Sequence, residues 1–288
     1  MSGTLYLVST PIGNLEDITL RALRILREEV TTVACEDTRQ TRKLLDHYGI
    51  AKPLLSYHEH NEASRAAEIV DLLQNGQSVA LASDAGTPLI SDPGYRVVHA
   101  AIETGCPVVP LPGASAALAA LAASGMPTDA FRFIGFLPSK GGARRRMVEN
   151  LRSETATVIA YESPHRILDA LSDIADVLGN GRRVAVAREL TKLHEEFLRG
   201  NAREIHKELA ARPAVKGEIT LVIEGSRGIE EVPLDPQAEV LRIQAEEGLS
   251  RMDAIKAVAK RTGLPKREVY RLFAEEGSSP PDKHRDSG

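Results

Sequence analysis

The sequence predicts an α/β protein made of two α/β domains and a small C-terminal helical module. In the first 111 residues, short β-branched or apolar runs alternate with amphipathic helical patterns, which is typical of a parallel sheet. Similar patterns return after an Ala-rich helix near residue 112, and the composition changes again after Gly225. We therefore expect domains at residues 1–111, 112–227 and 237–276, followed by a disordered tail at 277–288.

Turn and capping signals bound several of the predicted elements. Asp17 precedes the first helix, Gly76 follows the third, and Ser250 with Asp253 three residues later is a start signal in the C-terminal module. The expected strands are residues 5–9, 32–35, 54–57, 78–82, 108–111, 131–136, 157–161, 184–187 and 219–224. The expected helices are residues 19–28, 38–48, 61–75, 95–104, 164–178, 202–211, 237–247, 250–262 and 265–276.

Composition excludes several classes of protein. Of the 288 residues, 36 are Lys or Arg and 40 are Asp or Glu, so the chain as a whole is not a polycation built for phosphate backbones. Aromatic residues make up 4% and Trp is absent, which argues against a base-stacking platform. Cys35 and Cys106 are far apart, and His58 and His60 alternate without a third ligand, so we expect no disulfide and no metal site.

The N-terminus lacks the pattern of a signal peptide, and we expect a cytoplasmic protein. The uncharged stretch at residues 104–128 is long enough to span a bilayer. Four prolines and three glycines interrupt it, so we interpret it as buried protein interior with no membrane contact.

Positive charge is concentrated in two short segments, residues 139–152 and 251–271. Such segregation is typical of a protein with a local phosphate-binding face, although both segments could also be ordinary solvated helix surfaces. The residues that we expect to contact RNA are Lys140, Arg144, Arg145, Arg146, Lys260, Arg261, Lys266 and Arg267.

Three loops, at residues 9–15, 83–94 and 111–117, each follow a predicted strand. Because ligands bind at the carboxyl ends of parallel strands, these loops are candidates for a binding site. None contains the glycine pattern of a dinucleotide site or of a phosphate-gripping loop, which disfavours hydride transfer and ATP hydrolysis. Each loop also has a purely structural interpretation. The loop at residues 9–15 could be a simple turn, the loop at 83–94 a double turn, and the loop at 111–117 a place where a helix packs closely.

Several motifs occur in order along residues 5–225, and together they resemble the ribosomal RNA small subunit methyltransferase I family of the tetrapyrrole methylase superfamily. The motifs are TPIGNL at 10–15, EDTR at 36–39, SDAGTP at 83–88, DPG at 92–94, PG at 112–113, YESPHR at 161–166 and RELTK at 188–192.

The resemblance implies a tetrapyrrole methylase fold with S-adenosylmethionine bound in a cleft between the two α/β domains. It implies methyl transfer to the ribose 2′-oxygen of a cytidine in the decoding region of 16S rRNA, within the small ribosomal subunit, and a homodimer. The wider superfamily often has Asp where this chain has Thr87, so we expect the turn to hold the cofactor mainly through backbone groups. The cofactor-binding residues that it implies are Pro11, Asp84, Gly86, Thr87, Ile90, Ser115, Ala116 and Tyr161.

Methyl transfer from a sulfonium requires alignment and exclusion of water, and no metal. A ribose hydroxyl is a poor nucleophile near neutral pH, so a base or a cation would help. The catalytic candidates are Glu162, Arg188 and Lys192, with Asp37, His165 and Glu189 as further possibilities. Asp37 could instead cap the following helix, and Arg188 with Glu189 could form a structural ion pair.

Two other functions stay open. One is methylation of a tetrapyrrole, another small molecule or a protein side chain by a sibling of the same superfamily. The other is a DNA-binding regulator that senses a ligand with its α/β part. The basic segments and the helical module favour RNA over a small substrate, because a small substrate needs neither.

Overall fold

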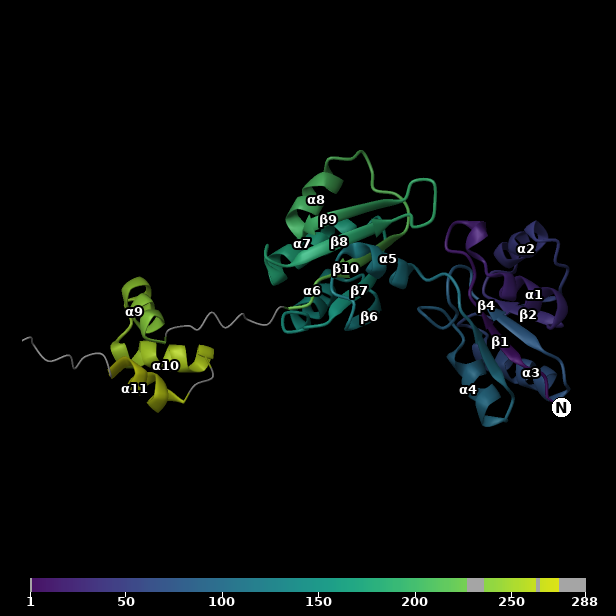
Figure 1. Ribbon diagram of the computed structural model, residues 1–288, viewed down its shortest axis with the longest axis horizontal. Helices are drawn as coiled ribbons and strands as arrows, with labels where there is room; N and C mark the ends of the chain where they lie inside the picture. Colours follow the sequence, from purple (N-terminus) through teal and green to yellow (C-terminus); the bar gives the residue numbers. More distant parts are fainter. Residues whose placement is uncertain (1, 227–235, 263–264, 275–288) are drawn as a thin grey trace, which may run out of the picture. The chain divides into compact units, whose positions relative to one another are not determined.

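The computed structural model of the protein describes residues 2–226, 236–262 and 265–274. The chain divides into two compact units, Met1–Ser226 and Arg227–Gly288, and each is described by itself (Figure 1). Both α/β sheets lie in the first unit, and the predicted boundary between residues 111 and 112 stays a prediction. The tail expected at residues 277–288 lies outside the described residues.

The first sheet is parallel throughout and has the strand order β3-β2-β4-β1-β5. β1 and β4 are central, so the loops that follow them meet at the same edge of the sheet. The strands are β1 (Leu5–Val8), β2 (Thr32–Cys35), β3 (Leu54–Ser56), β4 (Val79–Ala82) and β5 (Val108–Leu111).

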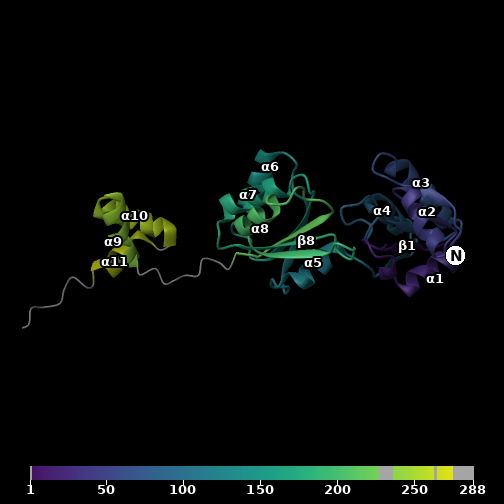
Figure 2. The ribbon, with the colours of Figure 1, turned by 90° about the horizontal axis from the view of Figure 1, so that it is seen from above.

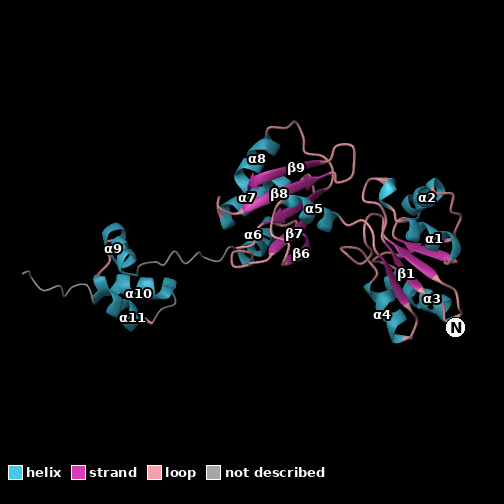
Figure 3. Cartoon of the chain, viewed as in Figure 1, coloured by secondary structure: helices cyan, strands magenta, loops and turns pink. Residues whose placement is uncertain are grey.

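Helices cover both faces of this sheet (Figures 1 and 3). α1 (Leu20–Glu28) and α2 (Thr38–His47) pack on one face through apolar residues that include Ile25 and Leu45. α3 (Glu62–Gln74) and α4 (Tyr95–Glu103) pack on the other face through Ile69 and Val97. Burial on both faces explains why the strands read as nearly continuous apolar runs.

The second sheet is mixed and has the order β6-β7-β10-β8-β9. β6 and β7 run parallel, whereas β10 is antiparallel to both β7 and β8. The pairing of β10 sets Ile219 opposite both Glu162 and Arg188. The strands are β6 (Phe131–Phe136), β7 (Thr157–Glu162), β8 (Arg183–Arg188), β9 (Glu196–Asn201) and β10 (Ile219–Ile223).

The two faces of the second sheet carry different helices (Figure 2). The Ala-rich α5 (Ala116–Ser124) packs on one face against residues such as Ile159 and Val222. α6 (Gly141–Asn150), α7 (Ile167–Leu178) and α8 (Ala202–Ala210) cover the other face, with Leu171 in the centre of that core. α5 buries one face through Ala117, Ala120 and Leu121, whereas Leu118 on its other face is 53% exposed, so the expectation that residues 104–128 are buried interior is met on one face of the helix only.

The second unit holds α9 (Pro236–Glu247), α10 (Arg251–Thr262) and α11 (Lys266–Ala274), around a core that includes Val240, Ile255 and Val269. The start signal before α10 is confirmed, because the Ser250 hydroxyl accepts a hydrogen bond from the Asp253 amide at 3.2 Å. Within the described ranges, no helix combines the length and apolarity that a membrane crossing needs.

The sequence did not predict α6 or β9, and it named the wrong capping residue for α1, although the expected helix at residues 19–28 is present. α6 begins with two glycines, and β9 is an edge strand of mixed polar and apolar residues that pairs with β8. Thr19, and not Asp17, caps α1 by accepting a hydrogen bond from the Ala22 amide, whereas Asp17 ends a short 3₁₀ turn. Each error arises where long-range pairing or a nearby competing cap outweighs the local pattern.

Candidate active site

Hydrogen bonds join the three loops that follow β1, β4 and β5. Thr10 and Gly86 exchange backbone hydrogen bonds of 2.9 and 3.0 Å, and the Thr10 hydroxyl donates to the Ser83 carbonyl. The Thr87 hydroxyl lies 3.1 Å from that of Ser9 and donates to the Ala114 carbonyl at 3.3 Å. The loops therefore form one rigid platform. The Thr87 hydroxyl bonds within this platform, to Ser9 and Ala114.

A cavity of about 390 Å³, called here the first cavity, lies between this platform and the second sheet. Its volume is that of a small-molecule site. On one side it is lined by the loop after β4 and by the N-terminus of α5, where Ser115 caps the helix. On the other side it is lined by the ends of β7 and β10, including Tyr161 and Thr220.

Seven of the eight residues expected to bind a cofactor line the first cavity. Pro11 is the exception, because it lines a neighbouring cavity instead. Of the three catalytic candidates, Glu162 lines the first cavity and Lys192 the neighbouring one, whereas Arg188 lines neither. The seven residues in the first cavity are Asp84, Gly86, Thr87, Ile90, Ser115, Ala116 and Tyr161.

Glu162 is buried at the end of β7. Its Oε1 accepts hydrogen bonds from the Ser163 amide at 2.7 Å and from Arg166 Nε at 3.0 Å. Among the described residues its Oε2 has no hydrogen-bond partner. These contacts hold the turn whose Ser163 and Pro164 form part of the wall of the first cavity.

The neighbouring cavity, called here the second cavity, has a volume of about 530 Å³. Lys192 is its most firmly held cation, because the ammonium lies 2.9 Å from Glu189 Oε1 and 3.2 Å from Glu218 Oε2. Burial acts to lower the pKa of Lys192, but the hydrogen bonds to Glu189 and Glu218 outweigh it and raise that pKa. Lys192 is therefore a fixed positive charge and not a base.

Two close approaches fix the Lys192 side chain. A Cβ at Gly13 would overlap Lys192 Cγ, and a Cβ at Gly217 would overlap the Glu189 side chain. Glu189 and Thr191 both adopt positive φ, of 52° and 64°, which non-glycine residues rarely do. Strain of this kind persists only where the surroundings enforce it, as at binding and catalytic sites.

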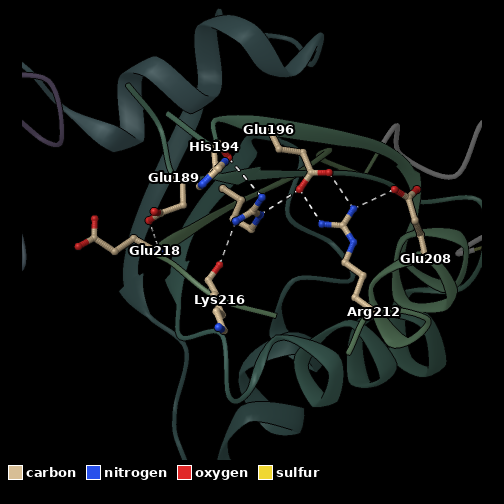
Figure 4. Close-up of polar contacts among 8 residues, drawn as sticks. Glu189, His194, Glu196, Glu208, Arg212, Lys216 and Glu218 are labelled. Carbon is tan, nitrogen blue, oxygen red and sulfur yellow. Dashed lines mark hydrogen bonds and ion pairs between the residues drawn. The ribbon is translucent and has the colours of Figure 1, made fainter. Parts of the chain in front are cut away.

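Glu196 and Arg212 lie at the centre of a cluster of polar contacts (Figure 4), and Arg188 belongs to this cluster through its ion pair with Glu196. Its Nε donates to Glu196 Oε2 at 2.9 Å, and its two other nitrogens donate to the Lys216 and His194 carbonyls. Glu196 also accepts two 2.7 Å hydrogen bonds from Arg212, which together with Arg188 lower the pKa of Glu196 to about 2. Arg188 therefore ties the loop 191–195 and the segment before β10 to β8.

Four carboxylates, those of Glu36, Asp37, Asp84 and Asp92, lie in the segments that follow β2 and β4. Burial raises the pKa of Asp92 to about 6, with contributions from Glu36 and Asp84. Burial also raises the pKa of Glu36. Asp37 behaves differently, because hydrogen bonds from Arg39 lower its pKa to about 2 while it caps α2. The expected alternative for Asp37, a helix cap, is what the structure contains.

The residues expected to contact RNA fall into three groups. Lys140, Arg145 and Arg146 are exposed at α6, and Lys266 and Arg267 are exposed at α11. Arg144 does not join them, because it is buried and its Nε donates to Asp173 Oδ2 at 2.7 Å. Its arginine-rich context hid this role, because sequence does not show which face of α6 packs on α7. The side chains of Lys260 and Arg261 lie outside the described residues.

Sequence reasoning missed several residues of these cavities. Ile12 and Glu218 line both cavities, and Asp92 and Phe136 line the first. Glu218 reaches the site because β10 is inserted between β7 and β8, a pairing that no local pattern reveals. Asp92 could have been found, since it follows the same strand as Asp84.

Comparison with known proteins shows to which family the chain belongs. The family model of tetrapyrrole (corrin/porphyrin) methylases matches residues 4–206. A ribosomal RNA small subunit methyltransferase I of Halalkalibacterium halodurans is 49% identical over 280 residues, covering 95% of this chain and 96% of that protein. The protein of the same name from Escherichia coli O157:H7 is 46% identical over 278 residues, with 95% and 96% covered. The chain belongs to the ribosomal RNA small subunit methyltransferase I family, within the tetrapyrrole methylases.

The fold of this methyltransferase agrees with solved structures of tetrapyrrole methylases. Uroporphyrin-III-C-methyltransferase from Thermus thermophilus matches 77% of this chain and 94% of its own with a TM-score of 0.54. At 21% identity this likeness shows the shared fold alone. The predicted fold class is confirmed, including its two α/β sheets and its tetrapyrrole methylase type.

Proposed function

We propose that the protein transfers a methyl group from S-adenosylmethionine to the ribose 2′-oxygen of a cytidine in the decoding region of 16S rRNA. The observation that carries this proposal is the first cavity, which brings together seven of the expected cofactor residues from the loop after β4, the start of α5 and the end of β7. Membership of the ribosomal RNA small subunit methyltransferase I family supports the same conclusion.

The lining of the first cavity fits S-adenosylmethionine. The N-terminus of α5, at Ser115 and Ala116, offers backbone N–H groups to a carboxylate. Ile90 and Tyr161 provide apolar and aromatic surface for a nucleoside. Asp92 places a carboxylate beside a cavity that would receive a positively charged sulfonium. When bound, the cofactor supplies an activated methyl group.

The catalytic candidates take different parts in this proposal. Lys192 directs a fixed positive charge into the second cavity, where it stabilises negative charge on an acceptor oxygen or a neighbouring phosphate. Glu162 shapes the wall of the first cavity through the Ser163 turn. Arg188 acts as a positioning residue, since it holds the loop that carries Lys192.

Contact with RNA is assigned to the exposed cations at α6 and α11. Lys140, Arg145 and Arg146 present positive charge on the first unit, and Lys266 and Arg267 do so on the second. Binding that rests on phosphate contacts weakens steeply with salt. Lys260 and Arg261 remain candidates from the sequence alone.

The test is methyl transfer to small ribosomal subunits from cells that lack the activity. Purified protein with methyl-labelled S-adenosylmethionine is expected to label 16S rRNA at one cytidine. Lys192→Ala is expected to lower turnover by about 10²-fold while cofactor affinity stays within about threefold. Lys207→Ala, which removes an exposed lysine of α8 that lines neither cavity, is the matched control for loss of positive charge. Label on a base, on protein or nowhere would overturn the proposal.

Two further expectations accompany this function. The family resemblance implies a homodimer, which sedimentation of the purified chain tests. We expect a cytoplasmic location, because the proposed substrate is a ribosomal subunit, and cell fractionation tests this expectation.

A further inference from the structure

The first and second cavities share a wall made of Ile12, Asp84, Ala85 and Glu218. A methyl donor in the first cavity can reach an acceptor only across a boundary common to both molecules. We infer that the second cavity receives the acceptor nucleoside, and that Asp84 takes the proton from its ribose hydroxyl. This inference rests on the proposed function and names the substrate subsite and the proton acceptor of that reaction.

Asp84 is held as a proton acceptor needs to be. Its Oδ1 accepts a hydrogen bond from the Asp37 amide at 3.0 Å, which fixes the carboxylate from a neighbouring strand end. Asp37 is itself fixed, because its own carboxylate caps α2 and accepts three hydrogen bonds from Arg39. Within the part of the chain that the structure describes, no hydrogen bond engages Asp84 Oδ2. One oxygen is thus anchored and the other is available at the shared wall.

The other carboxylates near the second cavity are already paired with cations or lie outside the cavity. Arg39 holds the Asp37 carboxylate and keeps its pKa near 2, so Asp37 is a poor proton acceptor. Glu189 and Glu218 are both paired with the Lys192 ammonium. Asp92 lines the first cavity but not the second. Asp84 is the carboxylate of the shared wall that the described residues leave without an ion pair.

The remaining lining of the second cavity suits a nucleoside within RNA. Leu15 and Leu44 give an aliphatic surface on which a flat base can pack without an aromatic partner. The Gln40 amide offers a donor and an acceptor to a base edge. Lys43 and Lys192 lie on the same lining and match the phosphates on either side of the nucleoside. A small substrate without phosphates would leave both lysines without a ligand.

The chemical step balances without a further reactant. The hydroxyl oxygen forms a bond to the methyl carbon, and the pair of the breaking carbon–sulfur bond returns to sulfur, which becomes a neutral thioether. The hydroxyl proton passes to the Asp84 carboxylate and leaves to water after product release. Lys192 keeps its proton throughout, because its ion pairs raise its pKa.

Asp84→Asn is the decisive variant, because the asparagine carbonyl still accepts from the Asp37 amide while it no longer takes a proton. We expect the single-turnover rate to fall by about 10²- to 10⁴-fold. We expect the affinities for S-adenosylmethionine and for unmethylated subunits, measured by calorimetry and filter binding, to stay within about threefold. Asp84→Glu should restore part of the rate. Asp71→Asn, which neutralises an exposed carboxylate of α3 that lines neither cavity, is the matched control and should keep a rate within about threefold of the wild type.

Leu15→Trp tests the cavity itself, because Leu15 lines only the second cavity and is partly exposed. The larger side chain should lower the affinity for unmethylated subunits by about tenfold or more, with cofactor affinity unchanged. The inference is overturned if Asp84→Asn keeps its rate, if it loses cofactor affinity together with its rate, or if Leu15→Trp binds subunits normally. Failure of the wild-type protein to label a ribose overturns the proposed function itself, and this inference with it.

Discussion

Gly13 packs against the Lys192 side chain so closely that a methyl group on Gly13 would overlap Lys192 Cγ. The contact joins the loop after β1 to the loop after β8, and the Asn14 amide strengthens it by donating to the Thr191 hydroxyl at 3.1 Å. The position of the Lys192 cation therefore depends on a residue that has no side chain.

Gly13→Ala is expected to displace Lys192 and to destabilise the fold by about 1–3 kcal/mol, as overpacking does. Turnover should fall more than cofactor affinity, because Gly13 lines only the second cavity. Gly142→Ala, on exposed α6 with no atom closer than 3.9 Å to the new methyl, is the control and should leave both unchanged. Equal effects of the two substitutions on turnover would refute the steric argument.

Arg144 and Arg146 are expected to separate stability from RNA binding. Arg144→Ala removes a buried cation that bonds Asp173 at 2.7 Å, so the free energy of unfolding should fall by about 3–5 kcal/mol. Arg146→Ala should leave stability unchanged and weaken subunit binding, with a smaller dependence on salt. Denaturant unfolding and filter binding at several salt concentrations measure the two effects. The opposite assignment would show that Arg146, and not Arg144, supports the core.

Glu196 is expected to make the free energy of unfolding depend on pH. Hydrogen bonds from Arg212 hold the folded-state pKa of Glu196 near 2, below its value in an unfolded chain. The contribution of Glu196 to the free energy of unfolding is therefore complete above pH 5 and is lost as the pH falls. Glu196→Gln should cost about 2 kcal/mol at pH 7, and this cost should shrink as the pH drops below about 4. Glu208→Gln, which removes an exposed partner of Arg212, should cost about 0.5 kcal/mol or less. A cost for Glu196→Gln that stays constant with pH would contradict the electrostatic explanation.

Asp92 is expected to act in the opposite direction. Burial raises its folded-state pKa to about 6, so the folded protein holds the proton more tightly and loses stability as the pH rises from about 4 to 6. Asp92→Asn should therefore stabilise the protein by about 1 kcal/mol at pH 8, after allowance for solvent screening, and change little at pH 4. Melting temperatures across this pH range measure the difference. A variant that is less stable than the wild type at pH 8 would show that ionised Asp92 has a stabilising partner.

The regular part of this fold could be predicted from sequence because its signals are local. The strands of the first sheet are short apolar runs buried on both faces, and Ser250 caps its helix through a neighbour three residues away. β9 could not be predicted, because its polar residues form a strand only when β8 pairs with them. α6 could not be predicted either, because it begins with two glycines and is stabilised as a helix by the packing of Val148 against α7.

The candidate site divides in the same way. Asp84 and Ser115 follow strands directly, so their places at the edge of the sheet could be foreseen. The role of Arg188 could not, because its partner Glu196 lies on a strand absent from the prediction, and two of its acceptors are backbone carbonyls. The second cavity was missed because its walls come from loops that meet only in three dimensions.

The central claim is methylation of a ribose in 16S rRNA. Its most direct test is mass spectrometry of the nucleosides from 16S rRNA after small subunits have reacted with this protein and S-adenosylmethionine. We expect one new nucleoside, cytidine methylated on the ribose 2′-oxygen, and no methyl group on any base. A methyl group on a base, or unmodified RNA beside a labelled small molecule, would contradict it.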